Sequence, residues 1–284
     1  MTGVAKIVKA IRAEKVHPEL RQRFQDEICE LLDWSGIDHQ SGGALKTFPG
    51  SQPVSLETKH LNEMKKQPYV ACEKSDGERF MLWIYEGSSY IFGRDFEIYK
   101  VDVMFPHVDG RAHHNTLLDG EIVLDCPRAT SSTQSPGASP GGSPSAKKRK
   151  QKGTYRYLVY DAIVVLSQKV ADKHLLQRLA IAYERVILPK YKTFAPSEFE
   201  PFQMYLKDFF EVWQSRAVMA FAERLPHECD GLIFTPVRKP YTPGTFRFLL
   251  KWKPPHLNSV DFRLHLIFHG RTKFHGRLLW ADEG

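Results

Sequence analysis

The 284-residue sequence has few cysteines and no long apolar run. Its four cysteines, Cys29, Cys72, Cys126 and Cys229, are scattered and form no Cys-x-x-Cys pair. This scarcity argues against a zinc site and a disulfide framework, and it suits a reducing compartment. The longest apolar runs, such as residues 162–166, are far too short to cross a membrane. The N-terminus has no apolar core followed by a cleavage site, so a secretory signal is not expected.

The remaining composition is that of an ordinary globular protein, because 42% of the residues are hydrophobic and 26% are charged. Lysine and arginine outnumber aspartate and glutamate by 40 to 33, which gives a formal net charge of +7. This excess permits a polyanionic partner but does not prove one. Part of the charge lies in the run KKRK at 147–150, so the folded body is less basic than the total suggests.

The chain changes its hydrophobic pattern along its length. Residues 17–34 have a helical pattern, in which Leu20, Phe24 and Ile28 recur on one face and Pro18 suits the first turn. From Tyr69 onward, short β-rich runs alternate with turn residues. The predicted strands are 69–74, 79–85, 89–101, 116–125, 155–166, 230–237 and 247–253, and the later predicted helices are 175–189 and 213–225. This order predicts an α+β fold with antiparallel sheets flanked by helices.

One segment has a different composition from the rest. Residues 129–146 contain almost nothing that could bury apolar surface, so we expect a disordered insertion at about 127–153 between two strands. Ser135, Ser139 and Ser143 each precede a proline, which fits either proline-directed phosphorylation or a plain spacer. The adjoining KKRK run fits a nuclear-import signal, a weak phosphate contact or a solvated charge cluster.

Charged residues recur inside the otherwise apolar predicted strands. They are Lys74, Asp76, Arg79, Arg94, Asp119, Glu121, Asp230, Lys251 and Lys253. Taken singly, each has an ordinary explanation, because Asp-Gly is typical of hairpin turns and Lys-x-Lys of the solvent face of a strand. Taken together, they bring carboxylates, lysines and arginines to the ends of several strands.

Such a set suits nucleotidyl transfer with Lys74 as the nucleophile. A lysine amine attacks the α-phosphorus of a nucleoside triphosphate only after losing a proton, so its usual pKa of about 10.4 must fall. Lys251 and Lys253 would supply positive charge near the phosphates. Glu121 and Asp230 would supply oxygen ligands for Mg²⁺.

The remaining members of the set have supporting roles in this hypothesis. Arg79 and Arg94 would orient phosphate or ribose oxygens. Tyr160 would stack on the base. Asp76 would orient the local turn or contact Lys74.

Five stretches resemble, in chain order, the signature motifs of the eukaryotic mRNA capping guanylyltransferases. They are EKSDGERFM, LLDGEIVLD, YRYLVYD, HECDGLIFTPV and LLKWKPPHLNSVDFRL. That family belongs to the covalent nucleotidyltransferases, together with the DNA and RNA ligases. KxDG is shared by the whole group, whereas DGLIF with LKWKPP and NSVDF indicates the capping branch. The resemblance covers about residues 48–266.

The resemblance implies that Lys74 takes GMP from GTP as a lysyl-GMP phosphoramidate and passes it to the diphosphate 5′ end of nascent RNA. It implies Mg²⁺ or Mn²⁺ at Glu121 and Asp230. The residues that it places at the nucleotide are Glu73, Asp76, Arg79, Arg94, Glu121, Tyr160, Lys207, Lys251 and Lys253. In this set Lys207 would face the guanine O6 and N7 acceptors. The family further implies a nuclear enzyme that works with an RNA triphosphatase and the phosphorylated tail of RNA polymerase II.

The sequence departs from the family pattern in three places. Gly93 precedes Arg94 where the family usually has an acidic residue, and the insertion separates two motifs. Residues 257–284 look like the start of an OB-fold lid, but they contain no RxDK motif. The expected organisation is therefore a helical leader at 1–45, a nucleotidyltransferase domain at 46–256 and an incomplete lid at 257–284. Without the RxDK groups, attack on GTP is expected to be impaired.

Two alternatives stay open on the sequence alone. An ATP-dependent polynucleotide ligase would share KxDG but not the WKPP and NSVDF residues. A lid-deficient nucleotide-binding or scaffold protein would bind without turnover.

Overall fold

The structure is a computed structural model that describes residues 3–34, 47–126, 153–197, 199–258, 262–269 and 273–280. Except for Gly153, the predicted insertion lies outside the described residues, as do its Ser-Pro sites and the KKRK run. The chain divides into an N-terminal unit, Met1–Trp252, and a C-terminal unit, Lys253–Gly284. Each unit is described by itself, and the domain boundaries expected near residues 45 and 256 stay predictions.

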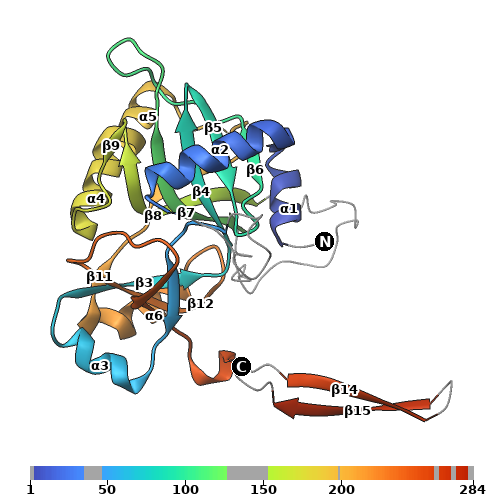
Figure 1. Ribbon diagram of the computed structural model, residues 1–284. Coiled ribbons are helices and arrows are strands. Elements are labelled where there is room, and N and C mark those ends of the chain that lie inside the picture. Colours follow the sequence, from blue (N-terminus) through green and yellow to red (C-terminus); the bar gives the residue numbers. More distant parts are fainter. Residues whose placement is uncertain are drawn as a thin grey trace, which may run out of the picture. The chain divides into compact units, whose positions relative to one another are not determined.

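The described strands of the N-terminal unit form two sheets (Figure 1). The larger has eight strands in the order β1-β6-β5-β4-β7-β8-β10, and β9 pairs with β8. Its strands are β1 (Glu14–Lys15), β4 (Glu78–Tyr85), β5 (Ser88–Phe92), β6 (Ile98–Val101), β7 (Thr116–Asp125), β8 (Thr154–Val165), β9 (Gln168–Lys169) and β10 (Gln203–Leu206). The smaller sheet has five strands in the order β11-β3-β12-β13-β2. They are β2 (Gln52–Ser55), β3 (Tyr69–Ser75), β11 (Phe210–Glu211), β12 (Cys229–Pro236) and β13 (Thr245–Trp252).

Short helices flank both sheets. They are α1 (Gly3–Ala10), α2 (Pro18–Leu31), α3 (Thr58–Met64), α4 (Leu175–Ala182), α5 (Leu188–Thr193) and α6 (Ser215–Ala222). The predicted helix at 17–34 is confirmed, with Pro18 in its first turn. Its buried stripe begins at Phe24, whereas Leu20 is 38% exposed.

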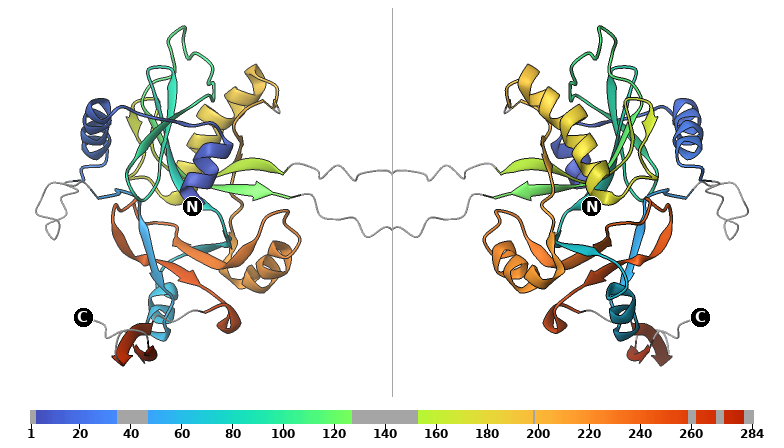
Figure 2. Two further views of the ribbon diagram at one scale, coloured as in Figure 1. Left: turned by 90° about the vertical axis from the view of Figure 1, so that its right-hand side faces the viewer. Right: turned by 90° about the vertical axis from the view of Figure 1, so that its left-hand side faces the viewer.

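The larger sheet is buried on both faces. Along β4, the alternate residues Phe80 and Leu82 join one core cluster, while Met81 and Trp83 join another. Helix α1 and the α4–α5 segment cover the first face, and α2 covers the second. Figure 2 shows the blue α2 and the gold α4–α5 segment on opposite sides of the sheet. Cover on both faces explains the nearly continuous apolar run of β4.

The smaller sheet packs one face on α6 and the other toward α4. Tyr69 and Ala71 of β3 lie with Val218 of α6 in one cluster. Val70, which points to the other face, lies with Leu175 of α4. Residues of β3 therefore alternate between the face that packs on α6 and the opposite face, which lies toward α4.

The predicted α+β class with antiparallel sheets is confirmed, and four details differ. Two edge pairs, β8 with β10 and β13 with β2, are parallel. The single strand predicted at 89–101 is two strands, β5 and β6. A turn separates them, in which the Phe96 backbone N–H donates to the Gly93 carbonyl. The helix predicted at 175–189 contains a π-helical segment, η2 (Tyr183–Ile187). It precedes Pro189, whose ring nitrogen cannot donate to the preceding turn. Finally, the 3-10 turn η3 (Val212–Gln214) occupies the start of the helix predicted at 213–225.

Of the four Asp-Gly pairs, Asp109-Gly110 forms a tight turn, in which the backbones of Val108 and Arg111 exchange two hydrogen bonds. The three pairs within the predicted motifs are not hairpin turns, contrary to the ordinary explanation of that dipeptide. Asp76 and Gly77 carry the chain from β3 in the smaller sheet to β4 in the larger. The other two pairs lie within β7 and β12. A Cβ atom at Gly77 would lie 2.5 Å from the Ile122 carbonyl oxygen, and one at Gly120 would lie 2.6 Å from the Tyr157 ring. Close packing, rather than turn geometry, requires these two glycines.

The described part of the C-terminal unit is a 3-10 turn, η4 (Pro255–Leu257), and an antiparallel hairpin of β14 (Phe262–His269) and β15 (Lys273–Trp280). The assignment of this unit to an OB-fold stays a prediction. Of the helices described in either unit, none is long and apolar enough to span a membrane.

A buried ion pair attaches α4 to the larger sheet, and its loss tests the packing. Arg178 donates from two nitrogens to the Asp161 carboxylate, and only 2% and 11% of these side chains are exposed. Replacing Arg178 by Met leaves a buried carboxylate without its cation, so we expect the free energy of unfolding in urea to fall by about 3–5 kcal/mol.

The exposed Arg185 in η2 provides the matched control. We expect Arg185→Met to change the free energy of unfolding by less than about 0.5 kcal/mol. Equal effects of the two substitutions would contradict a specific role for the buried pair.

Candidate active site

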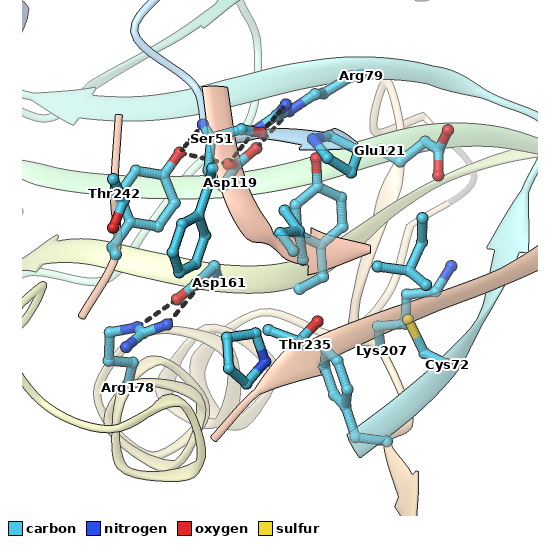
Figure 3. Close-up of a pocket in the computed structure, with 18 of the residues that line it drawn as sticks. Ser51, Cys72, Arg79, Asp119, Glu121, Asp161, Arg178, Lys207, Thr235 and Thr242 are labelled. Carbon is cyan, nitrogen blue, oxygen red and sulfur yellow. Dashed lines mark hydrogen bonds and ion pairs between the residues drawn. The ribbon is translucent and has the colours of Figure 1, made fainter. Parts of the chain in front are cut away.

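A pocket between the two sheets of the N-terminal unit gathers most of the predicted functional residues. It contains about 940 Å³ of empty space, part of which is open solvent, and this is large enough for a nucleotide-sized ligand. The larger sheet contributes Arg79, Asp119 and Glu121, and the smaller contributes Cys72 and Lys74. In Figure 3, Glu121 and Lys207 lie at one end of the pocket, and the Arg178–Asp161 pair lies at the other.

Lys74 lies one residue before the end of β3. Its side chain lines the pocket and forms an ion pair with Asp230. Its ammonium donates to Asp230 Oδ1 at 2.7 Å, and the two side chains are 24% and 19% exposed. Asp230 is the extra residue of a β-bulge in β12, because Cys229 pairs with Ser75 and Gly231 pairs with Lys74. The bulge turns the aspartate out of the regular alternation and toward the lysine.

Arg79 is fixed by a buried network at the start of β4. Its guanidinium donates to both carboxylate oxygens of Asp119, at 3.0 and 2.5 Å, and to the Ser51 carbonyl at 2.5 Å. The Tyr241 hydroxyl donates to the same carboxylate at 2.6 Å. Burial opposes the charge of Arg79, but Asp119 and the nearby tyrosines raise its pKa well above the ordinary value. The arginine is therefore held as a permanent cation in the wall of the pocket.

Tyr160 also owes its position to a bulge. In the β7–β8 ladder, Gly120 pairs with Val159 and Asp119 pairs with Asp161, so Tyr160 is the extra residue. Its ring lines the pocket, 5.8 Å from the Arg79 guanidinium carbon. Burial raises the pKa of its hydroxyl well above the ordinary value, so the ring stays neutral. A neutral aromatic ring in the wall suits stacking on a base.

Glu121 and Lys207 bring opposite charges to the end of the pocket near Lys74. Glu121 Oε1 accepts a hydrogen bond from the Gly77 backbone N–H at 3.3 Å, and burial raises the pKa of this carboxyl. Lys207 donates to Ser75 Oγ at 2.6 Å and pairs with Glu73 Oε1 at 3.2 Å. Burial acts to lower the pKa of Lys207, but neighbouring groups, Glu73 and Glu121 among them, raise it overall.

Cys72 is another potential nucleophile in the pocket wall. Burial raises the pKa of its thiol to about 12. A thiol with that pKa is not a nucleophile at neutral pH, which leaves Lys74 as the better candidate.

The pocket does not contain every predicted residue. Those that line it are Glu73, Lys74, Arg79, Arg94, Glu121, Tyr160 and Lys207. Asp76 is exposed, and its backbone N–H donates to the Glu228 carbonyl. Lys251 is exposed on β13, directly across the ladder from Ile233, which lines the pocket. Lys253 is the first residue of the C-terminal unit.

Four further residues hold the wall together and were not among the predicted site residues. Asp119 and Asp161 face each other across the β7–β8 ladder, and each binds its own arginine. In the sequence, the only signal for Asp119, Asp161 and Arg178 is that each is a charged residue within an apolar run. Tyr241 gives no such signal, because its contact with Asp119 joins residues 122 positions apart.

A divalent cation has partial support from the side chains present. Within the described residues, no three His, Cys, Asp or Glu side chains gather as a ready site. Of the two predicted carboxylate ligands, Glu121 lines the pocket, whereas Asp230 does not line it but contacts Lys74, which does. Mg²⁺ is commonly held by one or two carboxylates together with substrate phosphates, so the pair fits a cation that arrives with a polyphosphate.

Comparison with known proteins agrees with this geometry. The family described as mRNA capping enzyme, catalytic domain, matches residues 7–136 and 144–255. An mRNA-capping enzyme from Mus musculus is 34% identical over 273 residues, which cover 93% of this chain and 40% of the mouse protein. An mRNA-capping enzyme subunit alpha from Schizosaccharomyces pombe is 36% identical over 253 residues, which cover 80% and 56% of the two chains.

A weaker likeness exists to a solved structure, the ATP-dependent DNA ligase of bacteriophage T7 with ATP. Its TM-score is 0.46 at 17% identity, over 81% of this chain and 80% of that chain. The chain spans about half the length of the two capping relatives. The matched family covers both sheets and the pocket between them, and the chain therefore belongs to the mRNA capping enzyme family, as a form of its catalytic domain.

Proposed function

We propose that the protein is a GTP:RNA guanylyltransferase that acts through a covalent intermediate on Lys74. The observation that carries this proposal is the Lys74 ammonium, which lies in the wall of a nucleotide-sized pocket beside Arg79, Glu121 and Lys207. Family membership supports the same chemistry, since the relatives are mRNA-capping enzymes.

In the first step, the neutral amine of Lys74 attacks the α-phosphorus of GTP. The N–P bond forms, the bond between the α-phosphorus and its bridging oxygen breaks, and pyrophosphate leaves. Asp230, at 2.7 Å, is the acceptor within reach for the proton that the ammonium must lose. Arg79, fixed by Asp119, offers its guanidinium to ribose or phosphate oxygens.

In the second step, a terminal phosphate oxygen of a 5′-diphosphate RNA attacks the lysyl-GMP phosphorus. The new P–O bond completes the 5′–5′ triphosphate cap, and cleavage of the P–N bond regenerates the Lys74 amine. The ring of Tyr160 would hold the base while Lys207 faces its acceptor edge. When bound by Glu121 and Asp230, Mg²⁺ or Mn²⁺ would neutralise charge on the phosphates.

The cellular setting forms part of the same proposal. Family membership supports a nuclear enzyme that acts with an RNA triphosphatase and the phosphorylated tail of RNA polymerase II. The KKRK run in the sequence suits nuclear import. Nuclear fractionation, and co-purification with phosphorylated and unphosphorylated tail peptides, would test the two claims separately.

The first prediction concerns the nucleophile. With GTP labelled at the α-phosphate and Mg²⁺ or Mn²⁺, we expect label that stays with the protein on a denaturing gel. Lys74→Ala should abolish it, because it removes the proposed nucleophilic amine, while Lys207 and Lys239, which also line the pocket, stay in place.

The exposed Lys100 on β6 provides a matched control, and Lys100→Ala should label like the wild type. Label that persists in Lys74→Ala would show that the nucleophile is wrongly assigned. Label from ATP in place of GTP would support the polynucleotide ligase alternative.

The second prediction concerns the divalent cation. Glu121→Gln keeps an acceptor for Gly77 but removes a negative ligand. We expect the cation concentration for half-maximal labelling to rise at least about tenfold, the smallest loss usual for an outer-shell change at a metal site. The increase in melting temperature caused by Mn²⁺ with GTP should shrink as well.

The raised pKa of Glu121 adds a pH dependence to this prediction. In the wild type, cation binding should weaken as the pH falls through that raised pKa, at a higher pH than for an ordinary carboxyl. Glu121→Gln should lack this step, and the exposed Glu184→Gln control should keep it. Identical cation dependence in wild type and Glu121→Gln would remove Glu121 from the cation site.

A further inference from the structure

The loop before β12 and the first two residues of β12 contact the end of β3, the strand that carries Lys74. Three contacts join the two segments in succession. The Lys74 ammonium donates to Asp230 at 2.7 Å, and His227 Nε2 lies 3.4 Å from Ser75 Oγ. The Asp76 backbone N–H donates to the Glu228 carbonyl at 2.8 Å. We name residues 226–230 the clasp, because they hold residues 74–76 at three consecutive positions.

The clasp is itself attached to the larger sheet. His227 Nδ1 lies 2.8 Å from Asp125 Oδ1, at the last residue of β7. The Cys126 backbone N–H donates to the Pro226 carbonyl at 2.9 Å. Strand β7 also carries Glu121 and Asp119 of the pocket. The clasp therefore joins the strand of the nucleophile to the strand of the carboxylates.

Ser75 Oγ is the point where two of these contacts meet. The Lys207 ammonium can only donate, so Ser75 Oγ accepts from it at 2.6 Å. A hydroxyl has one proton and two lone pairs, so the same oxygen can also hydrogen-bond with His227 Nε2, as donor or acceptor according to the imidazole tautomer. His227 is buried with Asp125, since 7% of each side chain is exposed.

Such a link is needed because the chain changes sheets directly after Lys74. Ser75 is the last residue of β3, and Asp76 and Gly77 lead into β4 of the other sheet. Ladder pairing with β12 ends at Cys229 opposite Ser75, next to the bulge at Asp230. The nucleophile thus lies where the regular hydrogen bonding of its strand ends, and the clasp supplies the remaining constraints.

We propose that His227 is a positioning residue for the first chemical step. By bridging Asp125 and Ser75, it fixes the end of β3, so that the Lys74 amine and the Lys207 ammonium keep their places in the pocket. His227 does not line the pocket, and it acts through Ser75 rather than on the substrate. This inference rests on the proposed guanylyltransferase function, since it assigns His227 to the lysine that carries the nucleotide.

The test measures single-turnover formation of lysyl-GMP over a range of GTP concentrations. For His227→Ala we expect the maximal rate to fall on the order of 10²-fold, because small misplacement of a reacting group has effects of that size. The GTP concentration for half-maximal rate should stay close to that of the wild type, since no pocket-lining group is removed. Ser75→Ala, which cuts the same link and also removes an acceptor of Lys207 but leaves the His227–Asp125 contact, should lower the maximal rate in the same way.

A matched control and a conservative variant separate positioning from general stability. The exposed His107→Ala should keep the wild-type rate, and His227→Gln, which retains a hydrogen-bonding group for Ser75, should recover part of it. Melting temperatures show which variants fold, and Ser75→Ala decides alone if His227→Ala does not fold.

A wild-type maximal rate in a folded His227→Ala or Ser75→Ala protein would overturn the inference. If GTP binding were weaker in that protein, the clasp would be part of the binding surface instead. Absence of label in the wild type would instead contradict the proposed function, so the two failures are distinguishable.

Discussion

The ion pair between Lys74 and Asp230 is the interaction on which the rest of the site depends. A half-buried ammonium needs a carboxylate close by, and a nucleophilic lysine needs a route for its proton. Asp230 meets both needs only because a bulge in β12 turns it toward β3. These two side chains lie 2.7 Å apart. Their positions depend on the pairing of β3 with β12, on the crossing to the larger sheet at Gly77 and on the clasp at 226–230.

Buried charge organises the rest of the pocket in the same way. Asp119 and Asp161 face each other across one ladder, and an arginine neutralises each of them. The Asp119 pair fixes Arg79 in the wall, and the Asp161 pair attaches α4 beside the sheet. Such pairs are costly to break rather than strongly stabilising, so their main effect is to set geometry. The fold thereby presents its cations to the pocket in fixed directions.

Much of this arrangement can be predicted from the sequence, and the remainder depends on long-range packing. Apolar runs in the sequence predict strands β4, β7 and β8. The motifs that resemble those of a known family predict the roles of Lys74 and Glu121. The bulges that turn Tyr160 and Asp230 inward depend on ladder register, which no local pattern reveals. The Tyr241–Asp119 and His227–Asp125 contacts join residues more than 100 positions apart. Three of the four Asp-Gly pairs misled the local interpretation, because they lie within strands or at the crossing between the sheets and not in hairpin turns.

The central claim is that a phosphorus–nitrogen bond forms on the Lys74 side chain, and mapping that bond tests it most directly. After incubation with GTP and a divalent cation, the protein would be digested and its peptides analysed by mass spectrometry. If Lys74 is the nucleophile, the GMP adduct lies on the peptide that contains Lys74 and is labile in acid and stable in base, as expected for a phosphoramidate. An adduct on any other residue, or one that base removes and acid preserves, would contradict it.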